Sequence, residues 1–579
     1  MSDPYTFSSL ASPRSIRLLF LEPTAAAEEL SCTLKEVSID GGHTYEALSY
    51  EWGEQDPTGA SRIVCSGKTI TITPNCKAAL EFLRQPVDPR VLWVDAICID
   101  QTNLVEKSHQ IPLMGNIYEN ASVTIMWLGK DPLPAPAASA TAEAYAGKLN
   151  ADQVLVRTYF QRLWTLQEAA LSKRAVLMSE TVLVAWSDVV KSFLPLKEGL
   201  DFDKFSSNNF PGVMAHVDAT YLFNIKTRID PASWPSTLRF LLKKSRGQKT
   251  AEPKDRVFAL QAMFDAFAPG AFRAPDYGQS KQEIYTDNTR TMIYLESNLR
   301  ICRNAPSLHH DPQLPSWVPD WNDRDLIDWP PRQFCVDANP PPSLPNISTS
   351  ADELQVPIKV LGVVTSISTP APRLPPIQPQ SQTLVILRLA QEFTANLMLW
   401  SKIVRETFTP QYMLAIPRAV HRDLYCKYHT RLHIQRERRE NEPRPGMDFP
   451  NWAAQMTELS DPTMNIPLTS WALLKPEDVN IAAGEWELLG RSLLYAYGIL
   501  KDQQDLRMIG VASGLVGFAR SADVQAGDKV ALLPGANAPA ILRPEPVSGK
   551  YRLIGFAWIF GFMHELVWDC ATEEEVRLV

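Results

Sequence analysis

The stretch VLWVDAICID, residues 91–100, decides the fold class of the N-terminal part of this chain. It contains an unbroken apolar run, VLWV at 91–94, followed by Asp95. Such a run is typical of a strand that is buried on both faces of a parallel sheet and becomes polar where it emerges at its carboxyl end. Ligands of open α/β sheets bind at those ends, so Asp95 is a candidate for ligand contact. An aspartate at a strand end also commonly caps the following loop, and this alternative stays open.

Upstream of this strand, the sequence predicts a hairpin and a helix. RIVCSGKTITI (62–72) alternates apolar and polar residues on either side of Ser66-Gly67, which is typical of a β-hairpin. Pro74 then begins a helix that Thr73 caps. This helix comes directly before the buried strand.

Downstream, the alternation of helices and strands continues. Asn103, with Glu106 three residues later, resembles a capping box at the start of a helix that extends to about Asn120. Pro112 lies inside this helical pattern and should kink it. The sequence then predicts a second buried strand, a helix and a further strand: SVTIMWLG (122–129), residues 157–172 and AVLMS (175–179).

The predicted helix at 157–172 carries a carboxylate, Glu168, on its apolar face. One stripe of that helix combines it with three large apolar residues, Phe160, Trp164 and Leu171. We therefore expect Glu168 to be semi-buried. An unpaired carboxylate in apolar surroundings needs a partner, a ligand or a proton. Three interpretations stay open: a ligand-facing carboxylate, simple exposure, or a structural ion pair with Arg157 or Arg162.

The composition indicates a globular protein of several domains. At 579 residues and 64.9 kDa the chain is too long for one ordinary core, which favours two or three domains. A net charge of −8 and a pI near 5.7 argue against nucleic-acid binding, which depends mostly on neutralisation of phosphates by Lys and Arg. The eight cysteines are scattered without the spacing of a zinc site, which fits a reducing compartment. We expect a cytoplasmic protein with no membrane span, because no secretory segment and no apolar stretch of ~20 residues is present.

Four regions are expected along the chain. The third is a stiff connector, because prolines cluster at 328–334, 339–345 and 369–380. The regions are an α/β module (1–195), a helical middle region (196–325), the proline-rich connector (326–380) and a mixed α+β C-terminal region (381–579).

Four motifs follow one another in the N-terminal third of the chain: YEALSYEWG (45–53), LWVDAICIDQTN (92–103), MGNIYENASVTIMWLG (114–129) and FQRLWTLQEAALS (160–172). Together they resemble the HET domain of fungal heterokaryon incompatibility proteins. Later stretches look like the long C-terminal region of many such proteins, among them DRVFALQAMF (255–264) and LPSWVPDW (314–321). The chain departs from the family pattern at Asp100, where an asparagine is usual, and at Pro112, where proline is usually absent.

The HET domain is in turn similar to the TIR domain, a flavodoxin-like α/β module of immune and cell-death signalling. This resemblance implies a TIR-like or flavodoxin-like parallel sheet in the N-terminal module, followed by a larger mixed helical and β region. Some TIR domains hydrolyse NAD with a glutamate on their last helix, and by resemblance Glu168 is its counterpart. Similarity of fold alone does not transfer an activity.

Four further residues are candidates for the mouth of such a site. Ser49 and Tyr50 end the first predicted strand and could bind the nucleotide, the alternative for Ser49 being a backbone hydrogen bond. Gly53 should supply a backbone conformation with positive φ. Trp164 could stack on a base or belong to the core. No His or Cys spacing indicates a metal site.

The resemblance to HET proteins implies non-self recognition between fused hyphae, ending in growth arrest or programmed cell death. Other incompatibility proteins, or a second copy of the HET domain, are the implied partners. In an enzymatic mechanism, NAD is the substrate, Glu168 is the catalytic carboxylate, Asp95 assists, and no metal or resident cofactor is required. In an adaptor mechanism, the module only binds partners and Glu168 is structural. Recruitment to another pathway stays open as well.

Overall fold

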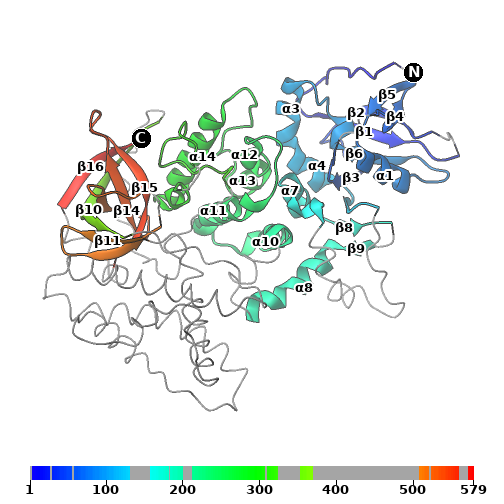
Figure 1. Ribbon diagram of the computed structural model, residues 1–579. Coiled ribbons are helices and arrows are strands. Elements are labelled where there is room, and N and C mark those ends of the chain that lie inside the picture. Colours follow the sequence, from blue (N-terminus) through cyan, green and yellow to red (C-terminus); the bar gives the residue numbers. More distant parts are fainter. Residues whose placement is uncertain are drawn as a thin grey trace, which may run out of the picture. The chain divides into compact units, whose positions relative to one another are not determined.

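The computed structural model describes residues 3–25, 29–54, 56, 58–130, 157–180, 183–199, 211–306, 310–323, 352–368, 507–520, 523–559 and 572–579. The chain divides into two compact units, Met1–Leu295 and Glu296–Val579. Figure 1 shows the helices and strands of both. Within the described residues, no helix has the length and apolar character needed to cross a membrane.

A nine-stranded mixed sheet lies at the centre of the first unit, in the order β5-β4-β2-β1-β6-β3-β7-β8-β9 (Figure 1). Four neighbouring strands, β6, β3, β7 and β8, are parallel. Counted along the chain, their spatial order is 2-1-3-4. The strands are β1 (Ser15–Leu21), β2 (Ser31–Ser38), β3 (Glu46–Tyr50), β4 (Arg62–Cys65), β5 (Lys68–Thr71), β6 (Arg90–Val94), β7 (Thr124–Trp127), β8 (Ala175–Met178) and β9 (Leu183–Ala185).

The expected α/β character of the N-terminal module is confirmed, but the sheet is not parallel throughout. β1 pairs antiparallel with both β2 and β6, which extends the sheet beyond the four parallel strands. β6 and β7 are the two strands predicted from buried apolar runs, and all four residues of β7 are buried. The carboxyl ends of β3, β6 and β7 therefore meet at one edge of the sheet, as parallel strands require.

The hairpin and the first helix follow the predicted local signals. Ser66 (φ 51°) and Gly67 (φ 80°) form the tight turn between β4 and β5, both in the left-handed region that such two-residue turns need. Helix α1 (Pro74–Leu83) begins at its proline, and the Thr73 hydroxyl accepts a hydrogen bond from the backbone N–H of Cys76. Both predictions are confirmed.

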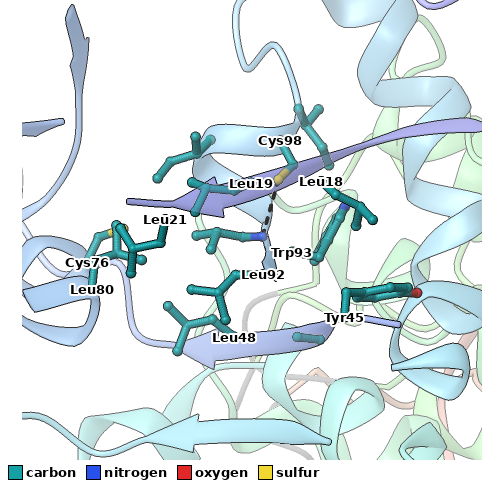
Figure 2. Close-up of a cluster of buried hydrophobic side chains, with 14 of the residues drawn as sticks. Leu18, Leu19, Leu21, Tyr45, Leu48, Cys76, Leu80, Leu92, Trp93 and Cys98 are labelled. Atoms are coloured by element: carbon teal, nitrogen blue, oxygen red, sulfur yellow. Dashed lines mark hydrogen bonds between the residues drawn. The ribbon is translucent and has the colours of Figure 1, made fainter. Parts of the chain in front are cut away.

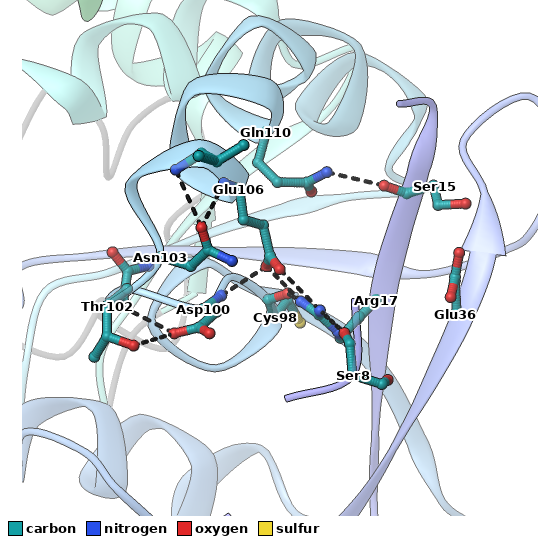
Figure 3. Close-up of polar contacts among 12 residues, drawn as sticks. Ser8, Ser15, Arg17, Glu36, Cys98, Asp100, Thr102, Asn103, Glu106 and Gln110 are labelled. Carbon is teal, nitrogen blue, oxygen red and sulfur yellow. Dashed lines mark hydrogen bonds and ion pairs between the residues drawn. The ribbon is translucent and has the colours of Figure 1, made fainter. Parts of the chain in front are cut away.

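The predicted helix after Asn103 is divided at Pro112 into α3 (Leu104–Gln110), a 3₁₀ turn η1 (Ile111–Leu113) and α4 (Met114–Asn120). The Asn103 side chain caps α3 by accepting from the N–H groups of Val105 and Glu106. A capping box also predicts that Glu106 accepts from the backbone N–H of Asn103, and this part of the prediction is wrong. The Glu106 carboxylate accepts from the Asp100 N–H and from Arg17 instead (Figure 3).

Arg17 and Glu106 form a buried ion pair beneath α3 (Figure 3). Their side chains are 4% and 8% exposed, and the shorter N–O distance is 2.5 Å. Arg17 also donates to the carbonyl oxygens of Cys98 and Ser8. The ion pair joins β1 to α3, and the bond to the Cys98 carbonyl oxygen joins β1 to the segment between β6 and α3.

The predicted helix at 157–172 is also divided, into η2 (Thr158–Gln161) and α7 (Trp164–Leu171). Arg162 is extended between them and forms a bridge with Lys249. The Leu163 N–H donates to the Lys249 carbonyl oxygen at 3.1 Å. The prediction of one continuous helix with a single stripe from 160 to 171 is therefore wrong, because a contact with a distant segment interrupts the helix.

The core of the sheet is made by side chains from β1, β3, β6 and α1, among them Leu19, Leu48, Trp93 and Leu80 (Figure 2). Cys98 is buried in the same cluster, and its Sγ accepts from the Val94 N–H at 3.4 Å. Burial raises the pKa of this thiol to about 12. Cys98 is therefore a buried structural thiol.

Helices complete the first unit. Helix α10 packs on α7, and α13 contacts α4, η1 and α7. The helices and turns are α8 (Trp186–Gly199), α10 (Pro211–Asn224), η3 (Lys226–Arg228), η4 (Pro231–Ser233), α11 (Trp234–Lys244), η5 (Ser245–Gly247), α12 (Asp255–Phe258), α13 (Gln261–Phe267) and α14 (Lys281–Glu296).

The second unit is built on a seven-stranded sheet, in the order β11-β12-β15-β14-β13-β10-β16. An added pairing of β10 with β11 closes six of the strands into a ring, and β16 also pairs with β15. The expected β-rich end is confirmed. Its elements are η6 (Arg300–Asn304), β10 (Leu354–Ile367), β11 (Arg507–Val511), β12 (Val516–Ala519), β13 (Lys529–Leu532), β14 (Pro539–Pro544), β15 (Tyr551–Ile559) and β16 (Thr572–Leu578).

The expected connector at 326–380 contains the long strand β10 between its proline clusters. Pro357 lies in this strand, opposite Glu575 of β16. The three proline clusters themselves lie outside the described residues.

Candidate functional site

Glu168 and Asp95 both lie near the carboxyl ends of the parallel strands. Glu168 projects from α7, which packs on β3 and β7. Asp95 follows the last residue of β6. The two carboxyl groups are near enough that the charge of Asp95 raises the pKa of Glu168. Two candidates that are 73 positions apart in sequence thus lie at one edge of the sheet.

The Glu168 carboxyl group is held by hydroxyl groups rather than by a cation. The Ser49 Oγ–H donates to its Oε2 at 2.5 Å, and Ser49 Oγ lies 2.7 Å from the Tyr159 hydroxyl. The Tyr118 hydroxyl lies beside the same carboxyl group and donates to the Leu48 carbonyl oxygen at 3.4 Å. Within the part of the chain that the structure describes, Glu168 forms no ion pair, so the interpretation as an ion pair with Arg157 or Arg162 is not realised.

Burial raises the pKa of Glu168 to about 7. Its side chain is only 4% exposed, which makes desolvation of the charged form the largest cause. The Asp95 charge adds to this effect, while the hydrogen bond from Ser49 and the charge of Arg162 oppose it. At neutral pH the group is therefore divided between its acidic and basic forms, as a general acid or base requires.

Asp95 is less enclosed than Glu168 and has two partners of its own. Its Oδ2 accepts from the Trp52 indole N–H at 2.8 Å, and its Oδ1 accepts from the Ala96 N–H at 2.7 Å. The second bond joins Asp95 to the next residue at the start of the short helix α2 (Asp95–Cys98), whose N-cap residue is Val94 and which has no side-chain cap. The capping role that the sequence left open for Asp95 is therefore not realised at this helix. Burial raises the pKa of Asp95, and the charge of Arg162 opposes that shift.

Arg162 supplies the positive charge near both acids. Its Nη1 donates to the Tyr50 carbonyl oxygen at 2.9 Å, and its guanidinium lies 5.8 Å from the centre of the Trp52 ring. The chain is extended at Arg162, between η2 and α7. The hydrogen bond to Tyr50 fixes the Arg162 side chain to the end of β3. The edge thus carries two carboxyl groups, one guanidinium and an aromatic ring.

The other predicted site residues differ in their positions. Ser49 lies on Glu168, whereas the Tyr50 side chain is buried beside Cys76. Gly53 has φ 70°, which confirms its predicted backbone conformation. Trp164 lies beside Asp255 in the helical region rather than on the Glu168 carboxyl group.

Four residues of this edge were not predicted as site residues: Tyr118, Tyr159, Trp52 and Arg162. Tyr118 belongs to the apolar stripe of α4, and Tyr159 lies in a 3₁₀ turn that was predicted as helix. A signal was present for Tyr159, because a tyrosine hydroxyl usually finds a hydrogen-bond partner when the ring is buried. Among the described residues, no group of three or more His, Cys, Asp or Glu side chains is arranged to hold a metal ion.

Comparisons with known proteins point to one family. Residues 45–146 match the family model described as "Heterokaryon incompatibility protein (HET)". The chain is also similar to "Heterokaryon incompatibility protein 6, OR allele" of Neurospora crassa, with 26% identity over an alignment that covers 55% of this chain and 60% of the relative. The similarity thus spans less than two thirds of the length of that relative. No solved structure matches this chain.

Proposed function

We propose that this chain, which carries a HET domain, acts in fungal heterokaryon incompatibility by cleaving NAD or a related nucleotide at the edge formed by Glu168 and Asp95. The family match and the similarity to an incompatibility protein support the biological role. Nucleotide cleavage is the more specific part of the proposal and is argued from the geometry around Glu168. Other incompatibility proteins, or a second copy of the HET domain, are the proposed partners.

One observation carries the chemical proposal. A carboxyl group with a pKa of about 7 lies where the parallel strands end, hydrogen-bonded to Ser49 on the parallel strand β3. The order 2-1-3-4 of the parallel strands is that of flavodoxin-like sheets, which bind nucleotides outside the carboxyl ends of their strands. The likeness to TIR domains is in keeping with both features.

The proposed reaction is hydrolysis of the bond between ribose C1′ and the nicotinamide nitrogen. The C1′–N bond breaks, its electron pair leaves with nicotinamide, and a water oxygen adds to C1′ and loses a proton. The ribose passes through a state that resembles an oxocarbenium ion, which the ionised Glu168 stabilises by charge. Asp95 adds negative charge at the same edge, and Arg162 offers a donor to phosphate oxygens.

A second function is favoured by the low exposure of the carboxyl group. Glu168 is 4% exposed and fully engaged with hydroxyl groups, which suits a structural residue. In this adaptor function the HET domain binds partners without chemistry. The enzymatic function instead requires a movement that uncovers Glu168, and η2 with Tyr159 is the element that would have to move.

Expression of the full chain in a fungal host, with measurement of cellular NAD and viability, tests the proposal. The wild type and Glu81→Gln, a control at an exposed carboxylate on α1, are expected to lower NAD and arrest growth. Glu168→Gln is expected to preserve NAD while keeping the wild-type circular dichroism spectrum. If Glu168→Gln still lowers NAD, the enzymatic proposal is refuted. Growth arrest without NAD loss in all three proteins would establish the adaptor function.

A further inference from the structure

A cavity of about 520 Å³ lies among helices of the first unit, and the residues that hold the Glu168 carboxyl group do not line it. We name it the α4–α13 cavity. It is lined by residues of α4, α13 and η3 and by the last residues of α7 and α10. Its volume falls within the range of small-molecule sites in proteins.

Small residues create this cavity. Gly115 of α4 lies so close to α13 that an added Cβ would be 2.5 Å from the Cβ of Ala262. Ala170 and Ala266 also line the space. Because these side chains are short, the helices approach at one point and leave room beside it.

The charge of the lining is negative. Glu119 on α4 and Asp265 on α13 provide a carboxyl group from each of two helices. Neither forms an ion pair within the described residues, and Asp265 accepts only long hydrogen bonds, of 3.3 and 3.4 Å, from Gln261. Among the lining residues Lys226 is the one cation, and its Nζ faces the rings of Trp234 and Phe267 at 6.0 and 5.5 Å.

Two helix ends add to this negative potential. Leu171 and Asn224, the last residues of α7 and α10, line the cavity. The final carbonyl groups of a helix have no partner within the helix and carry a partial negative charge. Burial also raises the pKa of Asp265, which a bound cation would relieve.

We propose that the α4–α13 cavity binds an aliphatic polyamine, whose ammonium groups pair with Glu119 and Asp265 while its methylene chain lies on the alanines. A single metal ion fits less well, because the cavity is far larger than an ion and its two carboxyl groups come from different helices. An anion fits less well because the carboxyl groups and helix ends would repel it. The proposal goes beyond nucleotide cleavage and does not depend on Glu168.

The test is calorimetric titration of the full chain with spermidine, together with its putrescine and monoamine analogues. The wild type is expected to bind spermidine more tightly than the monoamine. Glu119→Gln and Asp265→Asn are each expected to raise Kd about tenfold, since each removes one charged hydrogen bond. Lys226→Met is expected to lower Kd, because it removes a like charge. Glu81→Gln, a control at an exposed carboxylate outside the cavity, should leave Kd unchanged.

Hydrogen exchange on the wild type provides a test that does not require a folded variant. Spermidine is expected to protect amides of α4 and α13. Absence of binding at millimolar spermidine would overturn the proposal. So would binding that all of the variants leave unchanged, which would indicate a general attraction to a protein of net charge −8. Binding of inorganic phosphate that Lys226→Met abolishes would instead identify an anion site.

Discussion

Replacement of Glu168 by glutamine should change how the stability of the first unit depends on pH. Glutamine keeps an oxygen that accepts from the Ser49 hydroxyl but cannot ionise. In the wild type, burial raises the pKa of Glu168 from its ordinary 4.5 to about 7. One pKa unit corresponds to about 1.4 kcal/mol, so the carboxylate form costs the folded protein about 3 kcal/mol.

The sign of the change in the free energy of unfolding with pH follows from which state binds the proton. Between pH 4.5 and 7 the folded wild type holds a proton on Glu168 that the unfolded chain has lost, so its free energy of unfolding falls as pH rises through this window. The stabilisation is fully present below pH 4.5 and lost above pH 7. Glu168→Gln cannot ionise, so its stability does not fall in this way. The difference in free energy of unfolding between Glu168→Gln and the wild type should therefore change by about 3 kcal/mol in favour of the variant between pH 4.5 and pH 8.

Hydrogen exchange of peptides from β3 and α7, measured from pH 5 to pH 8.5 after correction for intrinsic rates, reports this difference for the first unit alone. Glu81→Gln is the matched control, since its carboxylate is exposed on α1 and its difference from the wild type should stay flat. Parallel curves for the wild type and Glu168→Gln would refute the reasoning, because they would mean that Glu168 does not titrate in this window.

Three further predictions concern stability and are checked by denaturant unfolding of the full chain. Arg17→Met should cost about 3–5 kcal/mol because it leaves the buried Glu106 carboxylate without its cation, whereas Arg14→Met, in an exposed pair, should cost less than about 1 kcal/mol; equal costs would contradict this. Gly115→Ala should cost about 1–3 kcal/mol through its clash with Ala262, and adding Ala262→Gly should restore most of that loss. Thr73→Ala should cost about 1 kcal/mol by removing the cap of α1, while Thr73→Ser should be nearly neutral.

Features that depend on neighbouring residues could be read from the sequence. The run at 91–94 becomes β6, Asp95 stands at its end, and the turn at Ser66-Gly67 joins two strands. In each case the signal lies within a few neighbouring residues: an apolar run, a capping residue or a residue that adopts positive φ. The family resemblance is also confirmed over residues 45–146.

Features that depend on distant partners could not be read in this way. The helix at 157–172 is interrupted because Leu163 donates to the backbone of Lys249, a segment that no local pattern connects to it. Glu106 does not complete the capping box of α3, because its carboxylate pairs with the distant Arg17. The same limit applies to the candidate site, where Tyr159 reaches Ser49 across 110 positions of sequence.

The ring of strands in the second unit imposes a delay on its own assembly. β10 ends at Ile367, yet its partners β11, β13 and β16 all come after residue 506. A ribosome adding ~5–20 residues per second needs roughly 10–40 s to proceed from the end of β10 to the end of β16. Throughout that interval β10 is a 14-residue strand without its final neighbours, open to pairing with other nascent chains. A premature stop codon between the codons for Ile367 and Arg507 would make this state permanent, so such truncated products should depend on chaperones or be degraded.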